Sequence, residues 1–178
     1  MSVVVAKITK DKIYISADSI VVRGWTQCHN TGNHITKLEE YNGIILGGCG
    51  SAEEISLFFH YIKTHSIEEA TEKNILDFVI EFKKWKRDLT DDKSLKNNYI
   101  IAYQGKCFGI SNMLIYEITN YDAIGAGMDY ALGALHQGAT TAEAVKAACD
   151  LCALVCEPIV TKIMQRNINN EISINKTN

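Results

Sequence analysis

Three cysteines near the C-terminal end have a spacing that could bind a metal ion. Cys149 and Cys152 are separated by two residues, as in many zinc sites, and Cys156 follows four positions later. A structural zinc ion needs four ligands, and no second Cys or His pair follows to complete them. The same cysteines interrupt residues 142–155, which are rich in Ala, Leu and Val at helical spacing. Because free cysteine is among the most often buried residue types, we interpret them as core-packing side chains.

Glycines and histidines form two further groups that could do chemistry. The glycine cluster within residues 43–50 lacks the spacing and the Lys-Ser/Thr ending of a phosphate-binding loop. Such glycines are also what a turn from a strand to a helix requires. Four histidines occur as two pairs, which we interpret as surface or packing positions: His29 with His34, and His60 with His65.

Length and charge restrict the class of protein. The 178 residues fit one domain, which we place at residues 1–166, followed by a polar, Asn-rich tail at 167–178 that we expect to be flexible. The net charge of −3 and the scattered Lys and Arg residues leave no basic surface for phosphates, so we expect no nucleic-acid partner. No segment has the length of a membrane span or the pattern of an export signal, and the six cysteines are then expected as reduced thiols. These features predict a cytoplasmic protein without a membrane partner.

The elements that must position any site are short strands and two helical pairs. β-Branched and aromatic runs predict strands at 3–8, 13–17, 34–38, 43–46, 99–103, 107–110, 114–118 and 159–164. Residues 18–33 have mixed composition and are predicted to be irregular. Ser51 with Glu54, and Ser66 with Glu69, are capping-box signatures for two consecutive helices that end near residues 65 and 88. A second helical pair is predicted at 130–137 and 141–156.

This order of elements predicts an α+β fold. Strands, two helices, strands, two helices and a last strand do not alternate regularly, which argues against a parallel sheet. The expected architecture is a four-layer αββα sandwich, in which two stacked antiparallel sheets lie between two helical layers.

Five points along the chain resemble a known superfamily. They are Ser2 at the head of a strand, residues 13–19 (IYISADS), residues 33–38 (NHITKL), residues 47–50 (GGCG) and residues 124–127 (IGAG) before a helix. Their order and spacing resemble the proteasome β-subunit superfamily of N-terminal-nucleophile hydrolases, and most closely the HslV-type peptidases. The resemblance covers nearly the whole chain and implies the same four-layer fold.

The resemblance implies catalytic roles for four residues. Ser2 matches the nucleophile once Met1 is removed, and its free α-amine, which titrates near pH 8, would serve as the general base. Asp18 and Lys37 match the acidic and basic partners of the nucleophile, and a buried ammonium beside the hydroxyl would lower the pKa of that hydroxyl. Gly47 matches the glycine whose N–H stabilises the oxyanion. The family needs no metal or cofactor, and none is expected here.

Two positions depart from the family pattern. Ala126 replaces a serine that would hydrogen-bond the amine of the nucleophile, and a methyl group cannot do so. The acidic residue that follows the last helix has only Glu157, or Cys156, as its counterpart.

Three functions follow as expectations. The first is a peptidase that cleaves unfolded polypeptide inside a homo-oligomeric ring, supplied by a separate unfoldase ATPase. The second is a catalytically inactive structural or assembly protein with the same fold, which the departure at Ala126 favours. The third is an amidase that acts on a small molecule, because one fold can host many substrates.

Overall fold

The computed structural model describes residues 2–24, 26–28, 36–92 and 94–166. Within these residues the strands form two larger sheets and one small hairpin. The first sheet is antiparallel in the order β10-β1-β2-β11 and contains β1 (Val3–Ile8), β2 (Lys12–Ala17), β10 (Tyr121–Gly125) and β11 (Val160–Gln165). β1 and β2 are the two inner strands of this sheet, so the chain enters the fold through a strand that is paired on both sides.

The second sheet is a meander. It runs in the order β5-β6-β7-β8-β9, and each neighbouring pair is antiparallel: β5 (Leu38–Tyr41), β6 (Ile44–Cys49), β7 (Asn98–Tyr103), β8 (Lys106–Ser111) and β9 (Leu114–Glu117). The small hairpin pairs β3 (Val21–Arg23) with β4 (Thr26–Cys28) around Gly24, which has a φ of 60°. This positive φ suits glycine.

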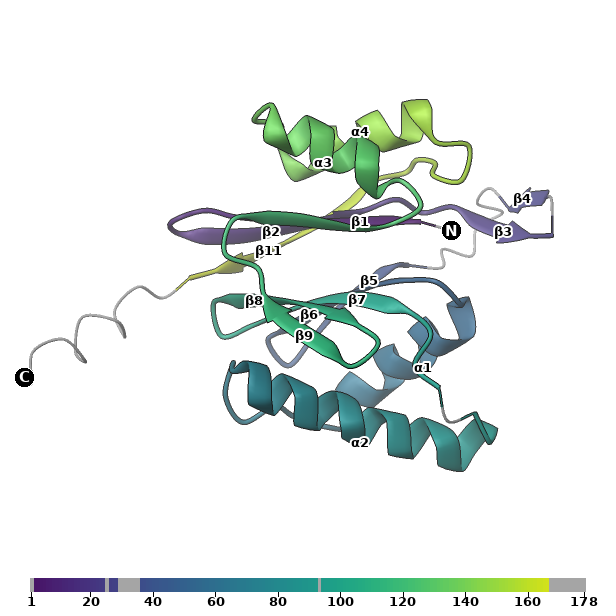
Figure 1. Ribbon diagram of the computed structural model, residues 1–178, viewed down its shortest axis with the longest axis vertical. Helices are drawn as coiled ribbons and strands as arrows, with labels where there is room; N and C mark the ends of the chain where they lie inside the picture. Colours follow the sequence, from purple (N-terminus) through teal and green to yellow (C-terminus); the bar gives the residue numbers. More distant parts are fainter. Residues whose placement is uncertain (1, 25, 29–35, 93, 167–178) are drawn as a thin grey trace, which may run out of the picture.

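Two helical layers cover the outer faces of the sheets (Figure 1). The helices α1 (Ala52–Ile62) and α2 (Glu72–Thr90) lie on the β5–β9 sheet, whereas α3 (Met128–His136) and α4 (Thr141–Leu151) lie on the β1 sheet. In α2 the buried apolar side chains recur at helical spacing, at Ile75, Phe78, Val79 and Phe82. That spacing gives the helix one apolar face for the sheet.

Three separate cores follow from this layering. The aromatic core between α1, α2 and the second sheet is centred on Phe58, which stacks on Phe82 with ring centroids 4.0 Å apart. Aliphatic side chains such as Val4, Ile15 and Ile100 fill the space between the two sheets. Small residues, including Ala131, Ala144 and Ala148, let α3 and α4 approach the first sheet closely.

The predicted fold class, an α+β sandwich of four layers, is confirmed by this arrangement. The strands after the N-terminus and the β7–β9 meander also lie where the apolar patterns predict them. Among the described residues, no helix is long and apolar enough to cross a membrane.

Several local predictions are wrong. Part of the segment predicted to be irregular forms the β3–β4 hairpin, and the strand predicted at 34–38 begins only at Leu38, with residues 29–35 outside the described part. The helix predicted from Ser66 begins at Glu72, because Thr71 accepts the N–H of Asn74 and caps it. The last helix ends at Leu151 rather than 156, because Cys152 has extended φ and ψ angles. The tail at 167–178 lies outside the described residues.

Candidate active site

Ser2 lies at the start of β1, in the interior of the molecule. Its residue is 2% exposed, and the register of β1 with β10 pairs the next residue, Val3, with Gly125. The Ser2 carbonyl oxygen accepts the N–H of Gly127 at 3.3 Å. Gly125 has a φ of 99°, and a Cβ there would lie 2.3 Å from the Ser2 oxygen, so only glycine allows this approach. The backbone of Ser2 is therefore fixed by the β10–α3 turn.

Asp18 lies directly after β2 and is held against the peptide that follows Ser2. Its Oδ1 accepts the N–H of Val3 at 2.8 Å, and its own N–H donates to the Val3 carbonyl at 3.3 Å. Its Oδ2 accepts the N–H of Ile20 at 3.2 Å and that of Cys156 at 3.5 Å. With 1% of the residue exposed, the carboxylate depends on these donors in place of water.

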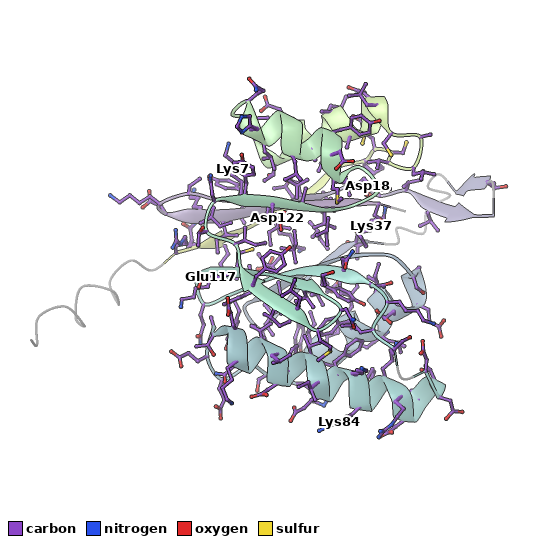
Figure 2. The ribbon with its side chains drawn as sticks, in the orientation of Figure 1. Lys7, Asp18, Lys37, Lys84, Glu117 and Asp122 are labelled. Carbon is purple, nitrogen blue, oxygen red and sulfur yellow. The ribbon has the colours of Figure 1, made fainter. Side chains whose placement is uncertain are left out.

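Lys37 completes the environment of this carboxylate. Its ammonium Nζ lies 2.7 Å from Asp18 Oδ2, and its residue is 6% exposed. The Lys37 carbonyl accepts the N–H of Gly48, which joins the segment before β5 to β6. Figure 2 shows Asp18 and Lys37 close together at the same end of the molecule. The fold thus brings together Ser2, Asp18 and Lys37 from three separate segments.

Cys49 is a neighbour of Ser2 that the sequence did not single out. It is the last residue of β6, its thiol donates to the Ile124 carbonyl at 3.5 Å, and it is hydrogen-bonded to the Ser2 side chain. Burial raises the pKa of the Cys49 thiol to about 12, although the charge of Lys37 acts in the opposite direction. A cysteine nucleophile must be a thiolate. Burial therefore disfavours the thiolate of Cys49, whereas Ser2 would carry a general base of its own, the α-amine, once Met1 is removed.

Gly47 and Gly50 differ in how they are placed at this site. Gly47 is inside β6, buried, with Leu38 and Ile100 as its register partners on the two sides. Gly50 follows the last residue of β6, beyond the end of the β6–β7 ladder, and is exposed. Its φ of 134° is a conformation that side-chain-bearing residues rarely adopt. Of the two, Gly50 has the N–H that lies outside the paired part of the strand.

The two departures from the family pattern have clear positions. Ala126 lies in the turn between Gly125 and Gly127 and is exposed, and its carbonyl accepts the Cys152 thiol at 3.6 Å. Glu157 is directed to Lys146 of α4 at 3.6 Å, with 55% of its side chain exposed. Neither supplies a polar side chain to the Asp18–Lys37 pair in this structure. Met1 lies outside the described residues.

Within the described part of the chain, no group of three or more His, Cys, Asp or Glu side chains is arranged to hold a metal ion. Cys149 and Cys152 are partly buried thiols that pack beside the first sheet, and Cys156 is also partly buried. Burial raises the pKa of the Cys149 thiol to about 12. A protonated thiol at this position is consistent with packing.

Similarity to known proteins lies in the structure rather than in the sequence. No protein-family model matches the chain, and no curated protein matches it. Among solved structures, BPH of Thiobacillus denitrificans is similar with a TM-score of 0.84 and 19% identity, and its complex with epoxomicin with 0.81 and 20%. Both comparisons cover 93% of this chain and 99% of BPH. HslV of Trypanosoma brucei follows with a TM-score of 0.71 and 17% identity, over 92% of this chain and 99% of HslV.

These likenesses and the four-layer architecture define the class of fold. The chain has the α+β sandwich of the N-terminal-nucleophile hydrolases. More narrowly, it has the proteasome β-subunit or HslV-type fold that was expected from the sequence. Identities of 17–20% define the fold and leave the reaction to be argued from the site.

Proposed function

We propose that this chain is a peptidase of the HslV type, with Ser2 as its N-terminal nucleophile after removal of Met1. The observation that carries the proposal is the buried Asp18 carboxylate, which binds the Val3 N–H and the Lys37 ammonium at the same time. This arrangement supports a positive charge close to the hydroxyl of Ser2. An unspecialised structural core has little use for an ion pair at the head of its central strand, because burying two charges costs more than burying apolar side chains.

The proposed reaction uses groups of the chain alone. The free α-amine of Ser2 takes the hydroxyl proton, and the hydroxyl oxygen attacks the peptide carbonyl to give a tetrahedral oxyanion. The amine proton passes to the leaving nitrogen, the C–N bond breaks, and water then hydrolyses the acyl ester. The positive charge of Lys37 favours the ionised form of the hydroxyl, and Asp18 holds the Lys37 ammonium in place.

For the N–H group that stabilises the oxyanion, we propose a different residue from the one that the sequence predicted. Gly47 was the residue expected from the sequence, but its place inside the paired strand β6 leaves little room for a substrate oxygen. We propose the N–H of Gly50 instead, because this residue is exposed and follows Cys49, which contacts Ser2. One preorganised donor of this kind is worth about 100-fold to 1,000-fold in kcat.

The test combines mass and activity. Intact-mass measurement of the native protein should show a chain that lacks Met1, and Ser2→Ala should abolish cleavage of a fluorogenic peptide amide. The rate for the unaltered chain should rise with pH through about 8, as the α-amine loses its proton. Epoxomicin, which BPH binds in one of the similar structures, should bind the processed chain and fail to bind Ser2→Ala. Hydrolysis that survives Ser2→Ala would refute the mechanism.

Assembly and location belong to the same proposal. We propose a homo-oligomeric ring that encloses the sites in the cytoplasm and receives unfolded polypeptide from a separate ATPase, since the chain has no nucleotide-binding loop of its own. A peptidase without narrow specificity needs such enclosure.

A second function has two specific observations in its favour. Ala126 offers a methyl group where the family pattern has a serine, and Glu157 faces Lys146 instead of the site. A structural or assembly protein with an unused site would tolerate both changes. Retained Met1, together with no turnover of peptides, would favour this second function over the first.

A further inference from the structure

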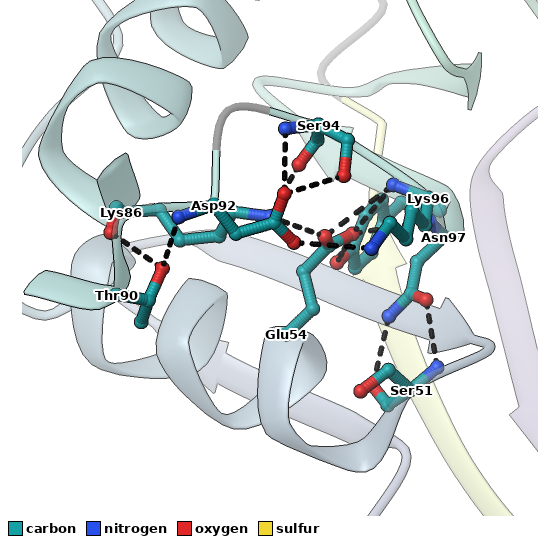
Figure 3. A network of polar contacts seen from close by, with 9 residues as sticks. Ser51, Glu54, Lys86, Thr90, Asp92, Ser94, Lys96 and Asn97 are labelled. Atoms are coloured by element: carbon teal, nitrogen blue, oxygen red, sulfur yellow. Dashed lines mark hydrogen bonds and ion pairs between the residues drawn. The ribbon is translucent and has the colours of Figure 1, made fainter.

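A buried polar network surrounds the turn at which β6 ends and α1 begins (Figure 3). At its centre is Glu54, in the first turn of α1, with 5% of the residue exposed. Its Oε2 lies 2.7 Å from Nζ of Lys86 on α2, and its Oε1 accepts the hydroxyl of Tyr99 on β7 at 3.0 Å. Lys86 is 2% exposed and also donates to the Ser94 carbonyl. The network therefore joins both helices of one layer to the sheet beneath them.

Asn97 links this network to the turn. Its backbone N–H donates to Glu54 Oε1 at 3.0 Å, which fixes the position of its backbone. Its side chain makes two hydrogen bonds to one residue: Oδ1 accepts the Ser51 N–H at 2.7 Å, and Nδ2 donates to the Ser51 carbonyl at 2.8 Å. One bond goes to the peptide before the Ser51 Cα and the other to the peptide after it, so together they restrict both the position and the rotation of Ser51. Asn97 thus clamps the residue after Gly50.

The same amide also shapes the space at Gly50. A Cβ on Gly50 would lie 2.0 Å from Asn97 Oδ1, so the two residues are in close contact. The peptide that joins Cys49 to Gly50 is bounded on one side by the contact of Cys49 with Ser2 and on the other by the Asn97 clamp. The position of this peptide is consequently restricted by groups that lie far apart in the sequence.

We infer that Asn97, held in place by the buried Glu54–Lys86 ion pair, is a positioning residue that fixes the Gly50–Ser51 turn so that the Gly50 N–H faces the reacting carbonyl. The inference rests on the proposed function, because it assigns a purpose to the turn in peptide hydrolysis. Asn97 itself touches neither substrate nor nucleophile and acts through the turn. A donor displaced by about 1 Å costs about 100-fold in rate, so the clamp has a measurable consequence.

The experiment compares Asn97→Ala with a control variant that also removes a side-chain hydrogen bond, in the other helical layer. Thr141→Val is the control, because Thr141 accepts a buried hydrogen bond from Ser16 at 2.7 Å in the opposite helical layer, and Ser16 keeps Thr161 as a partner. For each processed variant, kcat and KM are measured on the same peptide amide. Asn97→Ala should lower kcat by about 100-fold with KM unchanged, whereas Thr141→Val should leave both constants as in the unaltered protein.

A second measurement does not depend on activity. Amide hydrogen exchange followed by NMR should show the Ser51 N–H exchanging about tenfold faster in Asn97→Ala, because its acceptor is gone, while the N–H groups inside β6 stay protected. Unchanged exchange at Ser51, or an unchanged kcat in a protein whose hydrolysis requires Ser2, overturns the inference. If the unaltered protein shows no Ser2-dependent hydrolysis, the proposed function fails together with the catalytic purpose of the clamp. The exchange measurement still decides whether Asn97 fixes the turn.

Discussion

At the scale of single residues, the Asp18–Lys37 pair combines a structural with a proposed chemical task. Asp18 binds the backbone of Val3, Ile20 and Cys156, so it holds three segments together even without its cation. Lys37 adds a positive charge at 6% exposure. The two tasks are separable, because the backbone bonds need only an acceptor whereas the chemistry needs a charge.

Lys37→Met tests this separation. It leaves the Asp18 carboxylate buried without its counter-charge, so the free energy of unfolding should fall by about 3 kcal/mol, and peptide hydrolysis should be lost. Lys162→Met is the matched control, because Lys162 pairs with Glu40 at 3.5 Å with 28% and 49% of the side chains exposed. Such a surface pair is worth less than about 1 kcal/mol. Urea unfolding measures both variants.

The double variant Asp18→Asn, Lys37→Met separates the effect of lost stability from the effect of the lost ammonium. It removes both charges and retains one oxygen that can accept the Val3 N–H, while the new NH2 group faces the N–H groups of Ile20 and Cys156, so it should recover only part of the stability lost in Lys37→Met. Hydrolysis should remain absent, because the ammonium is still missing. Hydrolysis restored along with stability would show that the pair is only structural.

At the scale of elements, the turn after β6 depends on the conformation of one glycine. Gly50→Ala introduces a Cβ at a φ of 134° and 2.0 Å from Asn97 Oδ1, so it should destabilise the fold by about 1–3 kcal/mol and lower kcat. Gly133→Ala is the matched control inside α3, where nothing lies within 4 Å of the added Cβ. There alanine should stabilise by about 0.5–1 kcal/mol. Thermal unfolding should therefore shift in opposite directions, and shifts of the same sign would contradict the assignment of strain to Gly50.

The elements also show which part of the fold the sequence predicts. β1 and β2 were predictable because β-branched residues are concentrated in two runs around a charged turn. The capping box predicted at Ser51 and Glu54 does not form, because Asn97, 46 residues away, takes the Ser51 N–H and Glu54 turns to Lys86. A capping box does form at the start of α4, where Thr140 and Glu143 make both of its hydrogen bonds. We did not predict a box at that position from the sequence.

The candidate site likewise contains residues that the sequence predicted and one residue that it did not. Ser2, Asp18 and Lys37 were named through a resemblance of ordered motifs, whereas their composition alone marks them as an ordinary serine, carboxylate and lysine. Cys49 could not be found in this way, because its contact with Ser2 joins the end of β6 to the start of β1 across two different sheets. Long-range pairings of this kind leave no local periodicity in the sequence.

At the scale of the whole molecule, large apolar side chains are exposed on the layer formed by α3 and α4. They include Met128 and Tyr130 at the start of α3 and Leu151 and Leu154 around the end of α4, with 38–64% of each residue exposed. Exposed apolar side chains that gather on one layer are typical of surfaces that bind another protein. A second copy of the chain is the simplest partner, because most soluble oligomers are homo-oligomers.

We therefore expect a homo-oligomer whose mass is a multiple of the 19.8 kDa chain, measured by sedimentation at micromolar concentrations. Leu151→Glu places a charge on a side chain that is 64% exposed in the single chain, so it should shift the protein toward smaller species. Leu114→Glu is the matched control, since Leu114 is 63% exposed but belongs to β9 in the other sheet. Circular dichroism should show both variants folded. A single species of 19.8 kDa for the unaltered chain would contradict enclosure of the site in a ring and would leave the small-molecule amidase as the better enzyme hypothesis.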